Sequence, residues 1–167
     1  MNGSYSKGHQ PVKHQEFMGS ELTRKRYWAR SVPGWRTFHD AQPNPGHLAL
    51  AELEARGLVH SVVTQNVDRL HQKAGSRDVT DLHGRGDMCR CMSCDYTMPR
   101  KIMQETIEEL NADWLKQVRM PSHDDIRPDG DADIGNLDFS GFCVPGCPIC
   151  GGILKADVVV FGENVPR

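Results

Sequence analysis

The sequence has no long hydrophobic run and no strong charge of either sign. No apolar run approaches the roughly 18 residues that a transmembrane helix needs, and the N-terminus has no apolar stretch like that of a secretory signal. The formal net charge of −2 provides no general surface for polyanions. We therefore expect neither a membrane nor a nucleic acid as a partner.

Basic residues in the first 30 positions are interrupted by acids. Glu16 and Glu21 stand among the lysines and arginines, whereas a transit peptide is poor in acids. We therefore expect no targeting segment in this stretch. Residues 1–20 also contain Gly, Ser and His without periodicity, which predicts a loop.

The composition is that of a soluble globular protein with one or two domains, since 38% of the residues are hydrophobic and 25% are charged. Four of the six cysteines form two close pairs. Without a secretory signal, such pairs favour metal binding in a reducing compartment over disulfide bonds.

The spacing within each cysteine pair is typical of a zinc site. Two residues between thiolates allow a tight turn to aim both sulfurs at one tetrahedral ion. We predict one structural zinc, closed to substrate because four thiolates fill its coordination shell. The predicted ligands are Cys91, Cys94, Cys147 and Cys150.

Two cysteines remain outside this set. Cys89 and Cys143 are each interpreted as a buried small hydrophobic residue or a free surface thiol. Cys89 could replace Cys91 as a ligand, although its single-residue gap from Cys91 fits a zinc knuckle poorly. The 52 residues between the two pairs leave room for an inserted helix and an acidic loop.

Helices are predicted on both sides of the first cysteine pair. Residues 21–32 predict a helix that ends before Pro33, and Trp28 and Trp35 are interpreted as packing anchors. Residues 99–118 predict a second helix. Its expected apolar face consists of Ile102, Ile107, Leu110 and Leu115.

A helix followed by a buried strand is predicted in the middle of the chain, an order typical of a parallel sheet. The helix begins at Asn44-Pro45 and ends at Gly57, and His47 in its first turn is interpreted as a structural hydrogen-bonding group. Residues 59–63 and 157–161 predict strands. The expected apolar face of the helix consists of Leu48, Leu50, Ala51 and Leu53.

Residues 121–142 carry six Asp against one Arg and predict a loop. Three of these aspartates resemble the start of a calcium loop, but Gly135 comes one place late and Ser140 stands where a Glu is needed. We therefore interpret the segment as a solvated acidic loop. The three aspartates are Asp129, Asp131 and Asp133.

Polar side chains follow the predicted strand 59–63. Gln65, Asn66 and Asp68 come directly after it. His83 follows within 18 residues of Asn66. Ligands of open α/β sheets bind beyond the carboxyl ends of the strands. Histidine is a natural general base near neutral pH, while Asn and Asp offer hydrogen-bonding groups. The residues alone predict a polar site without specifying its reaction.

Several separated motifs, in this order, resemble those of the sirtuins. They are TQNVDRLH at 64–71, LHG at 82–84, the two cysteine pairs and KADVVVFGE at 155–163. Sirtuins are NAD-dependent protein deacylases and ADP-ribosyltransferases. The resemblance implies NAD as cofactor and acylated-lysine proteins as substrates.

Three further motifs resemble the class II branch, closest to the mitochondrial sirtuin-four type. They are RYWAR at 26–30, QPNPGH at 42–47 and PDGD at 128–131. The resemblance runs from about Tyr5 to the end of the chain. It implies a location in the mitochondrial matrix.

The resemblance also implies catalytic and cofactor-binding residues. His83 matches the catalytic base, Asn66 and Asp68 match residues that hold the nicotinamide and its ribose, and Gln65 matches a ribose contact. In this reaction the acyl-lysine oxygen attacks ribose C1′ as nicotinamide leaves. The histidine then takes a proton from a ribose hydroxyl, and the acyl group passes to ADP-ribose.

The peptide is implied to add alongside residues 157–163 by backbone pairing. Val159, Phe161 and Gly162 match its contacts. The family often has Phe where Val160 stands, so a wider acyl tunnel that suits long or branched acyl groups is expected.

One expected motif does not occur in these residues. Sirtuins bind the NAD phosphates with a Gly-rich turn, and the only Gly pair here, Gly151-Gly152, belongs to the zinc site. We expect an internal piece of a sirtuin that by itself binds NAD weakly and is inactive.

These features predict an α/β protein with a partial Rossmann-type parallel sheet and a smaller zinc-binding and helical module. The expected domains are a loop and helical segment at 1–43, the partial NAD-binding domain at 44–85 and 154–167, and the zinc module at 86–153. Two other interpretations stay open: a non-catalytic zinc-ribbon interaction module and a catalysis-dead sirtuin-derived regulator. An isolated ribbon would keep its cysteine pairs closer together and would not need TQNVDRLH.

Overall fold

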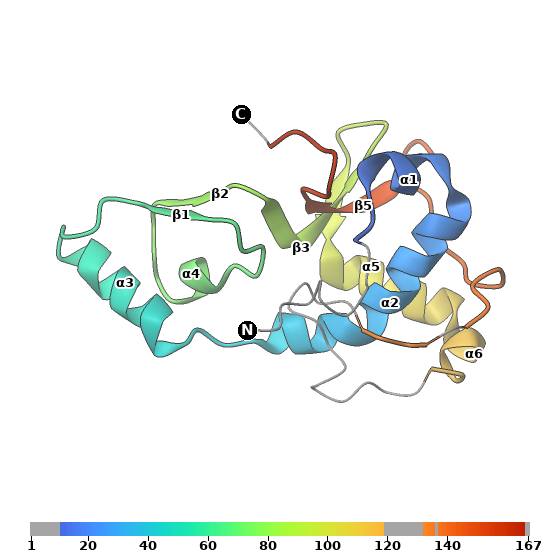
Figure 1. Cartoon of the computed structure of the whole chain (residues 1–167), viewed down its shortest axis with the longest axis horizontal. Helices are drawn as coiled ribbons and strands as arrows, with labels where there is room; N and C mark the ends of the chain where they lie inside the picture. Colours follow the sequence, from blue (N-terminus) through green and yellow to red (C-terminus); the bar gives the residue numbers. More distant parts are fainter. Residues whose placement is uncertain (1–10, 119–131, 136, 166–167) are drawn as a thin grey trace.

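The computed structural model describes residues 11–118, 132–135 and 137–165 of the chain. Its strands form one parallel and one antiparallel sheet (Figure 1). The helices are α1 (His14–Gly19), α2 (Glu21–Asp40), α3 (Pro45–Ala55), α4 (Leu70–Lys73), α5 (Arg100–Leu110) and α6 (Ala112–Leu115). The strands are β1 (Val62–Thr64), β2 (Val79–Asp81), β3 (Gly84–Cys91), β4 (Thr97–Pro99) and β5 (Leu154–Val158).

The elements form two lobes along the long axis of the molecule (Figure 1). We call residues 44–82, with α3, β1, α4 and β2, the parallel lobe. The cysteine lobe consists of residues 11–41, 84–118, 132–135 and 137–165. It contains the sheet β4-β3-β5 and helices α1, α2, α5 and α6.

The parallel lobe has the strand pairing that the sequence predicted. Strands β1 and β2 run parallel, with Val62 opposite Val79 and Thr64 opposite Asp81. The short helix α4 lies between them in the chain, as a crossover between parallel strands requires. This confirms the predicted α/β class.

The predicted buried strand at 59–63 is wrong in its bounds and its burial. The strand starts at Val62, and Val62 and Thr64 are buried while Val63 is 61% exposed. A continuous apolar run suggests a strand that is covered on both faces. The described part of the chain covers only one face of β1, so burial alternates along it.

Helix α3 begins where the sequence predicted. The Asn44 side chain accepts the N–H groups of Gly46 and His47 at 2.9 and 3.1 Å, and Asn44 N–H donates to His47 Nδ1 at 3.2 Å. This reciprocal cap confirms His47 as a structural hydrogen-bonding group. The predicted apolar face is not buried, because α3 has no buried residue and Leu48 is 53% exposed.

The predicted loop at residues 1–20 is wrong for its second half. Residues 14–19 form α1, because Phe17 is buried and packs edge-on against Tyr27 with ring centroids 5.3 Å apart. A single well-packed aromatic side chain thus stabilises a helix that the sequence pattern does not reveal. Residues 1–10 lie outside the described part of the chain.

Helix α2 continues through Pro33 instead of ending before it. A proline inside a helix removes a backbone donor and disturbs the neighbouring carbonyl groups. Two carbonyl groups just before the proline accept hydrogen bonds from distant residues: Ala132 N–H donates to the Arg30 oxygen at 3.1 Å, and Gln104 Nε2 donates to the Val32 oxygen at 2.9 Å. Tertiary hydrogen bonds therefore anchor the helix next to the proline.

The predicted helix at 99–118 is divided into α5 and α6 at Asn111. The Asn111 amide group donates to the carbonyl oxygens of Ile107 and Cys143 at 2.8 Å, and its oxygen accepts Cys143 N–H at 2.7 Å. The bonds to Cys143 dock the end of α5 onto the chain before the second cysteine pair.

The predicted apolar face of α5 is also partly wrong. Ile107 is buried, but Ile102 and Leu110 are 46% and 53% exposed. The buried face includes Arg100 and Gln104. Because two polar residues occupy this face, the apolar periodicity alone does not identify it.

Strand β5 starts three residues earlier than the predicted strand at 157–161. It pairs antiparallel with β3, and Ala156 lies opposite Cys89. The strand therefore belongs to the antiparallel sheet and is not hydrogen-bonded to β1 or β2. The predicted domain boundaries, including the grouping of 154–167 with 44–85, stay predictions.

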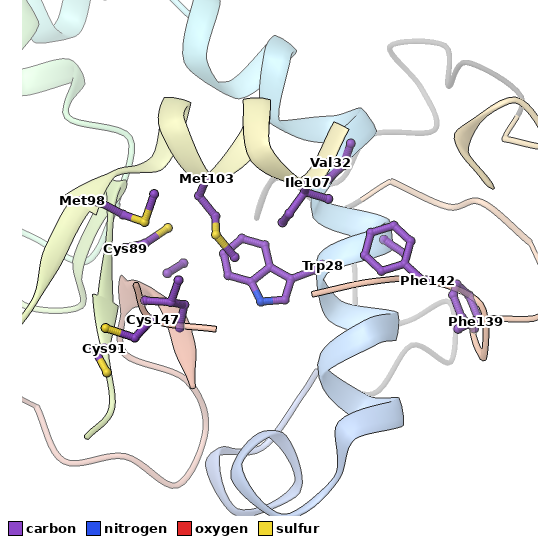
Figure 2. Close-up of a cluster of buried hydrophobic side chains, with 13 residues drawn as sticks. Trp28, Val32, Cys89, Cys91, Met98, Met103, Ile107, Phe139, Phe142 and Cys147 are labelled. Atoms are coloured by element: carbon purple, nitrogen blue, oxygen red, sulfur yellow. The ribbon is translucent and has the colours of Figure 1, made fainter. Parts of the chain in front are cut away.

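The core lies in the cysteine lobe, between the helices and the antiparallel sheet. Figure 2 shows the Trp28 indole between α2 and α5, close to Met103 and Ile107, with Phe142 on its other side. Trp28 is fully buried, as a packing anchor should be. Trp35 is only half-buried and borders a cavity that is described below.

Among the described residues, no helix combines the length and apolar character that crossing a bilayer requires. Asp129 and Asp131 of the predicted acidic loop, and the motif at 128–131, lie outside the described residues. Asp133 accepts the N–H of Gly135 at 3.1 Å, a local turn contact.

Candidate functional site

The four predicted zinc ligands lie together at the end of β3. Cys91 Sγ lies 3.5 Å from Cys150 Sγ, and Cys94 Sγ lies 3.8 Å from Cys147 Sγ. All four sulfurs lie within 4.8 Å of one another. Zn–S bonds of about 2.3 Å place tetrahedral sulfurs about 3.8 Å apart, so the cluster has the dimensions of a zinc site.

Glycines close the turn that carries the second cysteine pair. Gly151 N–H donates to the Cys147 oxygen and Cys147 N–H donates to the Gly152 oxygen, both at 2.8 Å. Gly151 has a left-handed φ of 71°, which favours glycine. A Cβ at Gly152 would lie 2.6 Å from Ser93 Oγ. The two turns therefore approach each other more closely than side chains would allow.

The electrostatics of the cluster call for a cation. Burial opposes ionisation of Cys91, but donors that include Ser93 N–H and the Cys150 thiol lower the pKa of Cys91 to about 7. Tyr96 N–H favours the Cys94 thiolate, but the neighbouring sulfurs outweigh it and raise the pKa of Cys94 to about 12. Adjacent thiolates repel one another, so all four sulfurs can ionise together only around a metal. Four thiolates are a donor set that suits zinc.

The two remaining cysteines have the two fates that the sequence left open. Cys89 is fully buried in the core, where burial raises the pKa of its thiol to about 12. Cys143 is exposed. Neither belongs to the cluster, so Cys89 does not replace Cys91.

A separate cavity of about 820 Å³ lies between the two lobes. Its volume is within the range of about 300–1,000 Å³ that is usual for small-molecule and cofactor sites. It brings together residues from three distant segments of the chain. Those that the sequence analysis had singled out are Gln65, Asn66, Asp68, His83, Val159, Phe161 and Gly162.

The parallel lobe contributes a polar loop to this cavity. Asn66 N–H donates to Thr64 Oγ1 at 3.0 Å, and Asp68 Oδ1 accepts Leu70 N–H at the start of α4 at 3.0 Å. The backbone is thereby fixed directly after β1. The Asn66 side chain is exposed and Asp68 is half-buried, so both can meet a ligand.

Arg69 holds the same loop against β2. It adopts a left-handed φ of 62°, the only positive φ outside glycine among the described residues, a conformation that costs energy in a residue with a side chain. Its guanidinium pairs with the Asp81 carboxylate, which also accepts a hydrogen bond from Gln72 Nε2 at 3.0 Å. This network stabilises the strained backbone at Arg69 and ties it to Asp81, two residues before His83.

His83 is linked by its backbone to the segment that follows β5. Val159 N–H donates to the His83 carbonyl oxygen at 2.8 Å. Gly84 has a φ of 78°, and a Cβ there would lie 2.2 Å from the Asp157 oxygen. Only glycine permits this approach, so LHG and the segment at 157–163 form one structural unit.

The sequence analysis did not identify Arg100 as part of the cavity wall. Its buried guanidinium stacks on Trp28 and Trp35, 4.9 and 5.3 Å from the ring centroids. It also donates to Gln104 Oε1 at 2.8 Å and to Ser31 Oγ at 3.1 Å. The sequence holds no signal for this site, because its partners come from two helices far apart in the chain.

The sequence analysis also missed two charged residues at the ends of KADVVVFGE. Lys155 is buried, and its Nζ lies 3.0 Å from Glu163 Oε2. Opposite charges that flank a β-branched run are a signal that could have pointed to this pair.

Comparison with known proteins gives one consistent family. A model of the Sir2 family matches residues 1–167. An NAD-dependent protein deacetylase of Bradyrhizobium diazoefficiens is 57% identical over 95% of this chain and 56% of its own length. An NAD-dependent protein deacylase of Arabidopsis thaliana is 44% identical over 99% of this chain and 47% of its own length. The chain thus spans about half the length of these curated relatives.

Solved structures with the same fold belong to that family too. A Sir2 structure with a p53 peptide and NAD+ superposes with a TM-score of 0.64 at 28% identity, over 92% of this chain and 50% of the other. A Sir2 protein bound to a propionylated peptide gives a TM-score of 0.60 at 28% identity over the same shares of the two chains.

Proposed function

The chain belongs to the Sir2 family, and on that premise we propose that it carries the catalytic histidine and the peptide-binding segment of an NAD-dependent protein lysine deacylase. The single observation that supports this most is the cavity between the lobes. It gathers His83, the loop at 65–68 and the segment at 159–162 around one space.

NAD, when bound, supplies the ADP-ribosyl group that accepts the acyl group. The side chains of Gln65, Asn66 and Asp68 offer donors and acceptors for an amide and for ribose hydroxyls. His83 would take a proton from a hydroxyl in the cavity, a role for which imidazole is suited near neutral pH. The acylated-lysine substrate would pair with the backbone near Val159 and Gly162.

The zinc would have a structural role. Cys91, Cys94, Cys147 and Cys150 would take all four coordination positions, and none of these residues lines the cavity. A metal with four thiolate ligands has no open position for substrate or water. It would instead hold β3 and the start of β5 in place, and these strands support His83 and the peptide segment.

Finer assignments rest on sequence motifs. RYWAR at 26–30 and QPNPGH at 42–47 support the class II branch of the sirtuin-four type, and with it ADP-ribosyltransferase activity and a place in the mitochondrial matrix. Val160 lines the cavity where a Phe is frequent in the family, which supports a preference for long or branched acyl groups.

Replacement of the proposed base is the direct test. In a protein of the relatives' full length that carries this segment, His83→Ala should lower acyl transfer by ~10²–10⁴-fold, with unchanged zinc content. The exposed His60, which lies outside the cavity, provides the matched control His60→Ala. Near-normal turnover of His83→Ala at saturating NAD and peptide would refute the assignment. A folded, zinc-loaded parent without turnover would favour the regulator interpretation.

Residues 1–167 alone should bind NAD weakly, because no Gly-rich turn for its pyrophosphate occurs in them. Calorimetric titration of this chain with NAD measures the contribution of such a turn. A dissociation constant in the micromolar range would mean that the loop at 65–68 and His83 suffice.

A further inference from the structure

One ion pair, between a buried lysine and a half-buried glutamate that lines the cavity, has no part in the chemistry described above. Lys155 is only 2% exposed, although lysine is rarely buried without a partner. Its Nζ donates to Glu163 Oε2 at 3.0 Å and to the carbonyl oxygen of Val158. The ammonium is therefore satisfied by one backbone group at the end of β5 and by one carboxylate from the residues that follow it.

The carboxylate of Glu163 is held from three sides. Besides Lys155, it accepts Val160 N–H at 2.9 Å and lies 3.3 Å from His14 Nδ1 at the start of α1. Burial opposes ionisation, but the Val160 N–H and the Lys155 ammonium outweigh it and lower the pKa of Glu163. The Glu163 carboxylate is therefore ionised at neutral pH.

The segment that this pair encloses is the proposed peptide-binding segment. Residues 158–163 turn back on themselves, with Glu163 N–H donating to the Val160 oxygen at 3.0 Å. Phe161 is bridged to Lys13, and its oxygen accepts His14 N–H at 2.8 Å. The ion pair joins the two ends of this turn, and the turn is connected to His83 through Val159.

We propose that Lys155 and Glu163 are positioning residues that set the backbone of residues 158–163 for pairing with an acyl-lysine peptide. This inference rests on the proposed function. A peptide that adds by backbone pairing needs a row of backbone groups already in place. A segment ordered before binding loses less conformational entropy on binding. Loss of the ion pair should therefore weaken peptide binding.

A role in stability alone would make a different prediction. Replacing both members of a buried ion pair by neutral residues of similar size is often neutral or stabilising, whereas removing one member leaves a costly unpaired charge. The double variant Lys155→Met/Glu163→Gln removes both charges and keeps the two side chains similar in size. It therefore distinguishes a role of the ion pair in positioning the backbone from a role in stabilising the fold.

The test is binding of a fluorescent acetyl-lysine peptide to the zinc-loaded chain, measured by anisotropy. The double variant should keep its zinc and melting temperature and lose about ten-fold in peptide affinity. Hydrogen exchange at the amides of Val159 and Val160 should speed up in parallel. The exposed pair Lys101 and Glu105, at 4.0 Å on α5, provides the matched control Lys101→Met/Glu105→Gln, which should bind like the wild type.

Equal peptide affinity of the double variant and the wild type would overturn this inference and leave the proposed function intact. A wild-type chain that binds no peptide would overturn the proposed function and this inference with it. If the double variant does not fold, Glu163→Asp serves instead, because it keeps the charge and withdraws it by one methylene from Lys155 and Val160. Unchanged peptide affinity in Glu163→Asp would equally overturn the inference.

Discussion

The two lobes differ in how much apolar surface they bury. The cysteine lobe contains nearly the whole core, with Trp28, Met103 and Phe142 fully buried. Among the described residues, Val62 is the only buried apolar side chain of the parallel lobe, whereas Leu58 in that lobe is 71% exposed. Burial of apolar surface is the main favourable term in folding, so the stability of this chain should reside in the cysteine lobe.

The cavity lies where the two lobes meet, so its two sides come from lobes that differ in how much apolar surface they bury. Gln65, Asn66 and Asp68 come from the less buried lobe, while Val159 and Gly162 come from the more buried one. Binding loops are usually drawn from the less stable parts of a protein. The cysteine lobe would therefore provide a fixed peptide side and the parallel lobe a more adaptable cofactor side.

Removal of zinc should have the largest effect on stability, because it destabilises the cysteine lobe, which contains nearly the whole core. Structural zinc contributes apparent binding energies of about 10–16 kcal/mol. We expect one zinc per chain by elemental analysis, and loss of cooperative unfolding after chelation or in Cys147→Ser. The exposed Cys143 provides the control Cys143→Ser, which should retain zinc. A zinc content near zero after gentle purification would refute the site.

Truncation of one large side chain in each lobe sharpens the comparison. Trp28→Ala should lower the free energy of unfolding by ~3–5 kcal/mol, since it empties the centre of the core. Leu48→Ala, at a 53% exposed position of α3, should change it by less than ~0.5 kcal/mol. Urea titration of both variants measures the difference. A cost for Leu48→Ala similar to that for Trp28→Ala would mean that α3 is packed after all.

Low pH should reduce the stability of the two lobes to different extents, and we expect this difference to be smaller than the effects above. Folding lowers the pKa of Glu163 below its ordinary value of 4.5. The resulting stabilisation is complete above that value and is lost as pH falls through the lower pKa of the folded state. Glu163→Gln should therefore flatten the decline in stability below pH 4.5, as followed by thermal melting at stepped pH.

Glu54 provides the matched acid in the parallel lobe. Its carboxylate accepts the N–H groups of Arg77 and Asp78 at 2.9 and 2.8 Å, which lowers the pKa of Glu54. Glu54 is half-buried, but both of its hydrogen bonds are exposed to solvent, so Glu54→Gln should alter the acid profile less than Glu163→Gln. The reverse order would contradict the assignment of stability to the cysteine lobe.

Local signals allowed the zinc site and one helix start to be predicted from the sequence. The ligand pairs Cys91/Cys94 and Cys147/Cys150 depend on turns of four residues, and the cap at Asn44 depends on its immediate neighbours. Gathering of the cavity residues also followed expectation, because His83 and the residues after β1 are close in sequence. The cysteine turns and the helix cap depend on short-range interactions, whereas the bond from Val159 to His83 joins residues far apart in the chain.

The errors occur where distant residues decide. Helix α2 passes Pro33, and next to the proline it is anchored by hydrogen bonds from the distant Gln104 and Ala132. The buried face of α5 was hidden because Arg100 stacks on tryptophans of α2. Lys155 was overlooked because its burial depends on pairing of β5 with β3. No local pattern encodes these partners, so a single sequence could not reveal them.

Hydrogen exchange, resolved along the zinc-loaded chain by mass spectrometry, tests the central claim most directly. The amides of β3, α5 and β5 should exchange only with global unfolding, and those of α3, β1 and β2 should exchange at least roughly ten-fold faster. Chelation of zinc should remove most of this contrast. Equal or stronger protection of the parallel lobe in the zinc-loaded chain would contradict the account.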